Sequence, residues 1–298
     1  MEDATLAYRD PFRSPGRWYR GNLHMHTTAS DGRRSPEEAV AWYRAQGYDF
    51  VAVTDHRACT PVDGLSSPGF LVLPGIEAHP GQNGVGEPYH VVAAGVTSAR
   101  RYGPDDPPQA AIDELRAAGA LVWLGHPHWL GSTLAELMAL EGYAGIEVYN
   151  STCLRFAKGY STVHWDDLLA RGRRVWGLAV DDTHWAGGDP GRGWVMVKAP
   201  ELTPRAILDA LAAGSFYASQ GPEIYDVQVG PQEVYVRCSP VASITCVSVS
   251  GSGRYALAES PERPLTEATI SRRSARVYVR IECTDAAGRT AWSQPYML

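Results

Sequence analysis

The sequence predicts a barrel-like α/β fold followed by a small all-β domain. Two observations support this prediction. From about residue 20 helix signals alternate with short apolar runs, and near Gly221-Pro222 the helix signals stop. Repeated helix–strand units of this length are typical of a parallel sheet, and their number favours a barrel. We therefore expect an N-terminal extension at 1–19, an α/β domain at 20–222 and a β domain at 223–298.

The first helix–strand unit shows the pattern clearly. Ser35 is expected to cap a helix, with Pro36 at its first position, Glu38 completing a capping box and the helix ending before Gly47. The run FVAVTDH at 50–56 then suits a buried parallel strand. The same order recurs, with helices expected at 109–119, 132–142, 165–172 and 203–214, before strands at 121–128, 145–150, 174–184 and 216–219.

The last quarter of the chain has a different character. Alternating apolar runs occur there at 224–229, 233–238, 243–250 and 275–283, separated by glycine, serine and proline. Such runs predict a sandwich-like β domain. Three of the five cysteines lie in it, and we expect them to be buried as small apolar residues. The odd cysteine count, without a C-x-x-C pair, argues against a disulfide framework and favours a reducing, cytoplasmic setting.

Composition argues against several classes of protein. The formal net charge is −6 and the pI about 5.8, which argues against duplex nucleic-acid binding through phosphate neutralisation. No apolar run reaches the roughly 18 residues of a membrane helix, and the N-terminus lacks the apolar segment of a secretory signal. We expect no membrane partner, and the oligomeric state stays open.

Acids and histidines gather at the ends of the apolar runs. Because the carboxyl ends of parallel barrel strands meet at one rim, these side chains are expected to share one mouth. His90 instead begins its run, and an antiparallel return would bring it beside Glu77. Histidines and carboxylates without cysteine are the ligands of hydrolytic Zn, Mn or Fe sites, and a carboxylate can bridge two ions. The residues in question are His24, His26, Asp55, His56, Glu77, His90, His126, His128, Asn150, Asp181, Asp182 and His184.

These motifs resemble the PHP (polymerase and histidinol phosphatase) superfamily over roughly residues 20–220. The matching segments, in order, are LHMHTTASDG, TDH, GIEAH, YHVV, GHPH and DDTH. The resemblance implies a distorted seven-stranded β/α barrel of the TIM-like, amidohydrolase-related type and a metal-dependent phosphoesterase. The segment from 221 to the C-terminus is similar to the β extension of a branch that includes a carbaryl-type ester hydrolase.

The resemblance also implies metal roles for individual residues. His24 and His26 would bind one ion with Glu77 and Asp182; the D-x-H spacing favours Asp182 over Asp181. Glu77 would bridge to a second ion held by His90 and His126. A third ion would be held by His56 and His184, with Asp31 as a further candidate ligand. Without that ion the two histidines would serve acid–base catalysis. Two or three divalent ions (Mn, Zn or Fe) are therefore expected, with Asp55 orienting a neighbour.

The expected substrate side departs from the family. Trp129 stands where many small phosphoesterases of this family carry a basic residue after HPH, and further aromatic residues crowd the mouth, which favours an organic substrate. His128 is expected to face the substrate and to join His56 and His184 in catalysis, while His79 is unassigned. Charged residues that could bind an anion, but are commonly solvated surface groups, are Arg57, Arg155, Lys158 and Arg192. The predicted substrate-binding residues are Trp129, Tyr149, Asn150 and Arg155.

Three functions compete on these grounds. The first is hydrolysis of a phosphomonoester or phosphodiester of a small molecule or nucleotide by metal-activated hydroxide. The second is hydrolysis of a carboxylic or carbamate ester at the same multinuclear site, which the aromatic mouth favours. The third is a non-catalytic metal-binding module, which the complete ligand set argues against.

Overall fold

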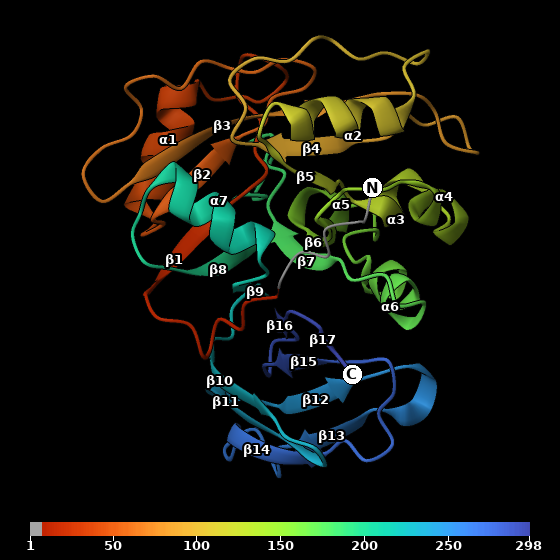
Figure 1. Ribbon diagram of the computed structural model, residues 1–298. Helices are drawn as coiled ribbons and strands as arrows, with labels where there is room; N and C mark the ends of the chain where they lie inside the picture. The colour runs from red at the N-terminus through yellow and green to blue at the C-terminus, as the bar shows by residue number, and fades with distance from the viewer. Residues whose placement is uncertain (1–7) are drawn as a thin grey trace.

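The computed structural model describes residues 8–298 (Figure 1). Part of the expected extension at 1–19 therefore lies outside the described residues. The first half of the chain contains β1 (Arg17–Asn22), α1 (Pro36–Ala45), β2 (Phe50–Val53), β3 (Leu71–Ala78), β4 (Val91–Ala94), α2 (Pro108–Ala117), β5 (Leu121–Leu124), α3 (Pro127–Leu130), α4 (Leu134–Ala139) and β6 (Gly145–Asn150). It is followed by α5 (Ser151–Leu154), α6 (Thr162–Ala170), β7 (Trp176–Val180), β8 (Trp194–Ala199), α7 (Pro204–Ala212) and β9 (Phe216–Ser219).

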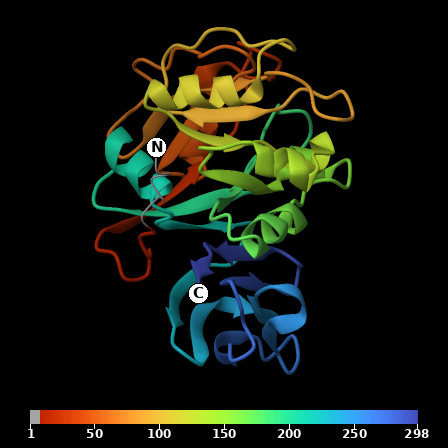
Figure 2. The ribbon, with the colours of Figure 1, turned by 45° about the vertical axis from the view of Figure 1, so that its right-hand side comes forward.

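The architecture is mixed α/β, with one large sheet that carries the strands in the order β8-β1-β2-β3-β4-β5-β6-β7. Pairing is parallel from β1 to β3 and from β5 to β7. An isolated parallel bridge between Met25 and Thr183 joins the chain just beyond β1 to the chain just beyond β7. The helices lie outside this curved sheet, as Figures 1 and 2 show. The strand ends thus converge on one region.

Strand β4 runs antiparallel to both β3 and β5. This is the return expected for the segment that begins with His90, and it pairs Glu77 with Val92. The sheet is therefore not purely parallel. Its antiparallel strand delivers the start of a strand, rather than an end, to the shared rim.

Helix α1 begins as the sequence predicts. The Ser35 hydroxyl accepts a hydrogen bond from the Glu38 amide, the Glu38 carboxylate accepts one from the Ser35 amide, and Pro36 occupies the first turn. The helix ends at Ala45, and Gly47 has a φ of 75°, the left-handed conformation that glycine adopts at low cost. The residues at its two ends are therefore sufficient to determine where this helix begins and ends.

The remaining elements are strands, with one 3₁₀ turn at Ser250–Ser252. They are β10 (Ile224–Val229), β11 (Glu233–Val241), β12 (Ser243–Val247), β13 (Arg254–Leu257), β14 (Leu265–Ser271), β15 (Tyr278–Thr284), β16 (Thr290–Ser293) and β17 (Tyr296–Met297). Strands β10, β11 and β14 form a separate sheet, whereas β16 pairs with β9 and so continues the large sheet into this region. Cys238, Cys246 and Cys283 are buried between the two sheets, as expected.

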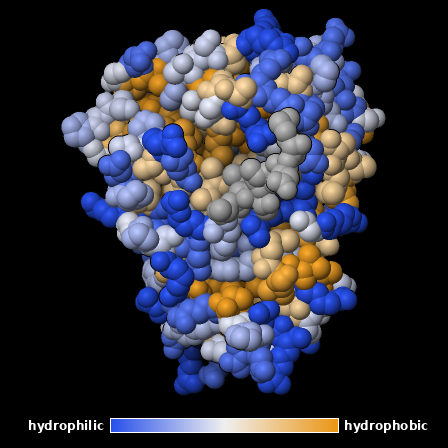
Figure 3. Space-filling view, viewed as in Figure 1, coloured by the Kyte–Doolittle hydropathy of each residue, from blue (hydrophilic) through white to orange (hydrophobic). Residues whose placement is uncertain are grey.

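Buried polar contacts tie the two halves together. The side-chain amide of Gln294 donates to the carbonyl of Gly177 and accepts from its amide. Arg280 on β15 bonds to both carboxylate oxygens of Asp166 on α6. On the face shown in Figure 3, hydrophobic residues gather near β15–β17, just below this junction. No helix within residues 8–298 is long and apolar enough to span a membrane.

Candidate metal centre

Four donor atoms from three separate parts of the chain face one another at the rim of the sheet. Nε2 of His24 lies 3.3 Å from both Glu77 Oε2 and Asp182 Oδ1. Nε2 of His26 lies 3.3 Å from Glu77 Oε2 and 2.9 Å from Asp182 Oδ1. Donors bound tetrahedrally at about 2.0–2.1 Å from an ion stand roughly 3.3–3.4 Å apart. The spacing of this group, which we call the central group, therefore fits one metal ion.

Several of these atoms are buried without a hydrogen-bond partner. Within the described chain, His24 Nε2 and Glu77 Oε2 of the central group are in this condition, as is the other ring nitrogen of His26, Nδ1. Burying a polar atom without a partner is costly. A cation between these atoms would satisfy His24 and Glu77 at once, so the donor set fits the metal that the sequence predicts.

A second group shares Glu77 and uses its other oxygen. Glu77 Oε1 lies 2.6 Å from His90 Nδ1 and 3.8 Å from His126 Nε2. The two imidazole nitrogens lie 2.8 Å apart. Oε2 of Glu77 faces His24, His26 and, at 2.7 Å, Nδ1 of His56, whereas Oε1 faces His90 and His126. Two oxygens that face different histidines are the arrangement required of a bridging carboxylate.

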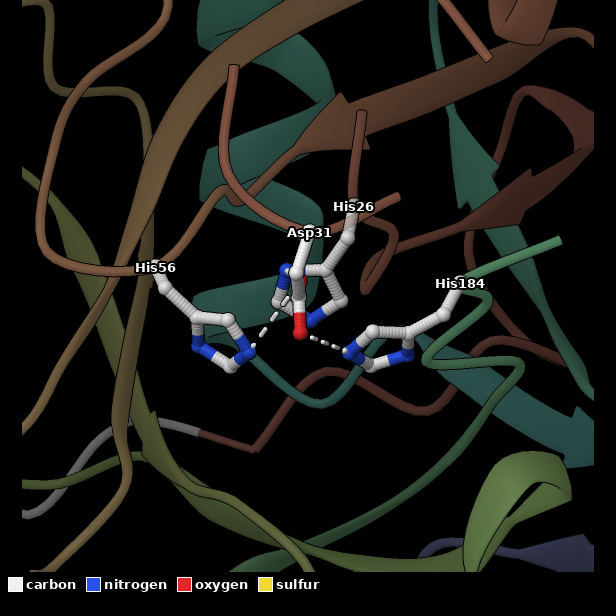
Figure 4. A group of neighbouring side chains, drawn as sticks. All are labelled: His26, Asp31, His56 and His184. Carbon is white, nitrogen blue, oxygen red and sulfur yellow. Dashed lines mark ion pairs between the residues drawn. The ribbon is translucent and has the colours of Figure 1, made fainter. Parts of the chain in front are cut away.

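A third group surrounds Asp31, as Figure 4 shows. Its Oδ1 lies 3.5 Å from His56 Nε2, and its Oδ2 lies 3.4 Å from His184 Nε2. Nδ1 of His26 stands 4.0 Å from Oδ1. This group is more open than the other two, since the Asp31 side chain is 56% exposed. It could hold an ion or act on the substrate directly.

The backbone aims these side chains in different ways. His24 and His26 flank Met25, and both rings are fully buried on the same side, as alternation in an extended segment requires. His126 has a φ of 26° and Asp182 a φ of 51°, values that are uncommon for residues other than glycine. His126 directly follows Gly125, and Asp182 is the second residue after β7 ends. Such conformations persist where the surrounding structure enforces them, and they concentrate at functional sites.

Three carboxylates near His24 are buried without a basic partner other than histidine. Glu77, Glu147 and Asp182 are each less than 5% exposed, and their ion pairs within residues 8–298 all involve histidines. Burial alone would raise their pKa values, but the surrounding histidines hold the pKa of each carboxyl below its usual value. This concentration of buried negative charge requires cations close by.

The histidines of the cluster differ in their ionisation. Desolvation lowers the pKa of His90 to about 4, against the opposing charge of Glu77. Desolvation also acts on His56, but Glu77 and Asp31 outweigh it and raise the pKa of His56 to about 10. His90 is therefore neutral at pH 7, the form in which a histidine binds metal. At His24 and His126 neighbouring carboxylates outweigh desolvation and raise the pKa, so a bound ion would have to displace protons there. His56 holds a proton and is more exposed, so it can donate that proton to a bound molecule.

Glu147 is the main site residue that the sequence reading missed. Its Oε1 lies 2.6 Å from His24 Nδ1, and its Oε2 lies 3.0 Å from His126 Nδ1. It also accepts hydrogen bonds from the indole of Trp123 and the side-chain amide of Asn150. A single glutamate within the otherwise apolar run GIEVYN was the available signal. Through its contacts Glu147 fixes the rings of two histidines from two different groups.

Two acids near the cluster bind backbone and hydroxyl groups instead. Asp181 accepts hydrogen bonds from the Tyr43 hydroxyl and from the amides of 191, 192 and 193. Asp55 accepts from the amide and hydroxyl of Thr27 and from the hydroxyls of Ser30 and Thr60. Asp55 thereby shapes the loop 27–32, which carries Asp31. That loop is tight, because a Cβ at Gly32 would lie 2.5 Å from the His26 carbonyl oxygen.

A cavity of about 340 Å³, the mouth cavity, opens over the three groups. Trp129 and Arg155, two of the four residues predicted to bind substrate, line it. The Trp129 ring lies 5.6 Å from that of His126 and 5.9 Å from that of His90, measured between centroids. Phe156, which the sequence reading did not single out, forms part of the same wall and is 64% exposed. The cavity therefore has an aromatic side next to the second group.

Three predicted site residues lie elsewhere. His128 does not line the mouth cavity. It lies on helix α3, which begins directly after His126, and its Nδ1 donates to the Tyr160 carbonyl. Tyr149 is buried in the core against Tyr160 and Trp292. Asn150 lies beneath the cluster, where its side-chain amide donates to Glu147 and Asp182. It positions carboxylates and does not line the cavity.

Comparison with solved structures places this architecture among known folds. No family model matches the chain, and no curated protein does. A two-domain protein from Bacteroides vulgatus, described as containing a predicted PHP-like metal-dependent phosphoesterase, aligns over 100% of this chain and 99% of its own length, with a TM-score of 0.55 and 17% identity.

Two further structures align over a smaller part of the chain. A putative metal-dependent phosphoesterase from Bifidobacterium adolescentis covers 55% of this chain and 87% of its own, with a TM-score of 0.43 and 15% identity. An amidohydrolase from Chromobacterium violaceum, with bound sulfate and no metal, covers 57% and 89%, with a TM-score of 0.41 and 16% identity. The alignment with the Bacteroides vulgatus structure alone confirms the resemblance, at the level of the fold. The likeness of the C-terminal strands to the carbaryl-hydrolase branch stays a prediction.

Proposed function

We propose that this protein is a metal-dependent hydrolase that cleaves a phosphoester of a small molecule. The observation that carries the proposal is the group of three buried carboxylates, Glu77, Glu147 and Asp182. Within residues 8–298 their ion-pair partners are all histidines, and Oε2 of Glu77 and Nε2 of His24 lack a hydrogen bond. Divalent ions would supply the missing positive charge, polarise a phosphoryl oxygen and provide a nucleophile at neutral pH. Manganese, zinc and iron all suit this nitrogen and oxygen donor set.

The ligands divide among the groups as follows. His24, His26, Glu77 and Asp182 would hold one ion, and Glu77, His90 and His126 a second. His26, Asp31, His56 and His184 would hold a third. Strands β1 to β7, joined by the bridge at Met25, would form the distorted seven-stranded barrel that supports them. Residues 20–222 would form the hydrolase unit and 223–298 the β domain.

His56 and His184 have a second role where only two ions bind. Both rings line the mouth cavity, and both contact Asp31. In that state His56 donates a proton to the leaving oxygen, and Asp31 holds its ring in place. The negative charge of Glu77 helps to raise the pKa of His56. An ion bound to Glu77 would neutralise part of that charge, so the pKa of His56 would fall toward the operating pH. That fall would make His56 a better proton donor.

A carboxylic or carbamate ester is the second candidate substrate. The aromatic side of the mouth cavity, formed by Trp129 and Phe156, supports it. The deciding experiment measures hydrolysis of nitrophenyl phosphate, bis-nitrophenyl phosphate and nitrophenyl acetate by protein loaded with manganese, zinc or iron. We expect phosphate release with at least one metal. Acetate hydrolysis without phosphate release under any metal would reject the phosphoesterase in favour of the second candidate.

A further inference from the structure

A second cavity, of about 490 Å³, adjoins the mouth cavity. We call it the arginine cavity, because Arg57 and Arg101 line it together with His79. It shares two lining residues with the mouth cavity, Asp31 and His56. A molecule whose ester lies over the metal groups could therefore extend past His56 into this second space.

The two arginines have no partner of their own. Within residues 8–298 neither guanidinium makes an ion pair or a hydrogen bond to the protein. Arg100, the neighbour of Arg101 in the chain, by contrast binds both Asp106 and Glu114. Carboxylates that could neutralise a guanidinium are thus present in this segment, but Arg101 uses none of them. Two free guanidinium groups in one cavity are suited to a shared anion.

The backbone holds Arg57 in an unusual conformation. Its φ is 62°, and its amide donates a hydrogen bond of 2.8 Å to the carbonyl of Glu77. A residue with a side chain adopts a left-handed conformation only at a cost, because its Cβ approaches the following carbonyl oxygen. The bridge that pairs His56 with Glu77 fixes this turn, so Arg57 leaves the strand at the edge of the metal groups. Its place in the cavity wall follows from the same contacts that position Glu77.

His79 also lines this cavity. The residue is 8% exposed, and its Nδ1 has no hydrogen-bond partner within the described chain. Its Nε2 lies 3.0 Å from Nδ1 of His56. The cavity thus brings together two guanidinium groups that have no partner within residues 8–298, beside a histidine, and these cationic groups suit an oxyanion.

We propose that the arginine cavity binds a second oxyanion of the substrate, separate from the ester that is cleaved. The substrate class is then a phosphoester whose alcohol carries a remote phosphate or carboxylate group. This inference rests on the proposed function, since it places the scissile ester over the metal groups. An ion held by Asp31 would also remove the repulsion that this carboxylate exerts on an anion in the shared part of the cavity.

The test uses the full, metal-loaded protein and alkyl phosphates with chains of three to six carbons. The far end of each chain carries a methyl group, a carboxylate or a phosphate. At one chain length the terminal anion is expected to lower KM by about tenfold or more, as expected for charge-assisted bonds to arginine. A preference for phosphate alone would identify the second group as phosphate, and a preference for both anions would identify a general oxyanion site.

The double variant Arg57→Gln/Arg101→Gln should lose most of this preference, and each single variant part of it. The matched control is Arg171→Gln, an exposed arginine that pairs with Asp167 on α6 and should keep the preference. Arg57, Arg101 and Arg171 are all exposed, so replacing them should leave the thermal unfolding midpoint unchanged. Equal KM values for methyl and anionic substrates at every length would overturn the proposal, as would a preference that survives in the double variant.

A direct binding measurement separates this inference from the proposed function. If no alkyl phosphate is hydrolysed, the phosphoesterase proposal fails. Calorimetric titration with butane-1,4-bisphosphonate and with butylphosphonate then tests the arginine cavity alone. Tighter binding of the bisphosphonate, lost in the double variant, would support the cavity as an oxyanion site, whereas equal binding of the two ligands would refute it.

Discussion

Glu147 and His24 form a buried pair in which Oε1 lies 2.6 Å from Nδ1. This contact fixes the ring of His24 so that its Nε2 points toward Glu77 and Asp182. Neither residue is exposed to solvent. Glu147 therefore sets the orientation of a proposed metal ligand by holding the ring nitrogen that does not face the metal group.

Replacing Glu147 by glutamine should weaken metal binding without removing a ligand. Glutamine keeps the size of the side chain but loses the charge that orients His24 and His126, and changes of this kind typically cost 10–100-fold in metal affinity. Competition with a chromogenic chelator measures the effect. The control is Glu259→Gln, whose side chain is 78% exposed. Equal affinities in the variant, the control and the parent protein would show that Glu147 does not position the histidines.

Two histidines that are two residues apart should respond differently to alanine. His126→Ala removes a group that faces Glu77 and His90, so metal content and activity should fall together. His128→Ala removes a ring bonded to the Tyr160 carbonyl, and activity should stay within about twofold, as for a substitution outside the site. Metal analysis and initial rates on both proteins check this. If His128→Ala lost activity but kept its metal, His128 would have the catalytic role that the sequence analysis predicts.

Metal retention should fall as the pH falls. The ligand histidines must be neutral to bind an ion, so protons compete with the metal as the pH falls. At His24 and His126 neighbouring carboxylates outweigh desolvation and raise the pKa, so these two rings are protonated first. Opposing histidines hold the pKa of Glu77 and Asp182 below the usual value despite burial, so these carboxylates stay ionised through the same range. Metal content after gel filtration between pH 8 and pH 4 records the loss. Retention that increases toward acid pH would contradict this set of ligands.

Arg280→Ala should destabilise the whole molecule. The Arg280 side chain is 2% exposed and binds Asp166 across the junction of the two halves. Removing one partner of a buried ion pair costs about 3–5 kcal/mol, and the low end applies because Asp166 is 34% exposed. Urea unfolding gives the free energy. Arg171→Ala, a change to an exposed pair, serves as the control, and an equal small loss in both variants would show that the junction contributes little.

The sequence predicts much of the fold and of the cluster because both follow local rules. The capping box at Ser35 and the placement of His24, His56 and Asp182 after apolar runs need no tertiary information. The antiparallel return at His90 also follows from the order of polar and apolar residues. Strand β8 was not expected, because its run WVMVKA has no helix before it and pairs antiparallel with β1 and β9.

The missed residues depend on irregular backbone. A register shift in β6 falls between Glu147 and Tyr149, so simple alternation does not assign their faces. Glu147 and Asn150 consequently reach the cluster, while Tyr149 packs into the core. At His126 the chain enters a helix instead of continuing as a strand, which separates His128 from it. Neither feature has a residue pattern that alternation or helical periodicity would detect.

Metal content, measured by mass spectrometry on protein produced in metal-supplemented medium, tests the central claim most directly. The measurement compares the parent protein with His26→Ala, since His26 contributes nitrogens that face both the central group and Asp31. We predict at least two ions per chain in the parent protein and a loss of metal and hydrolytic activity in the variant. Fewer than one ion per chain in the parent, or full metal and activity in His26→Ala, would contradict the proposed metal centre.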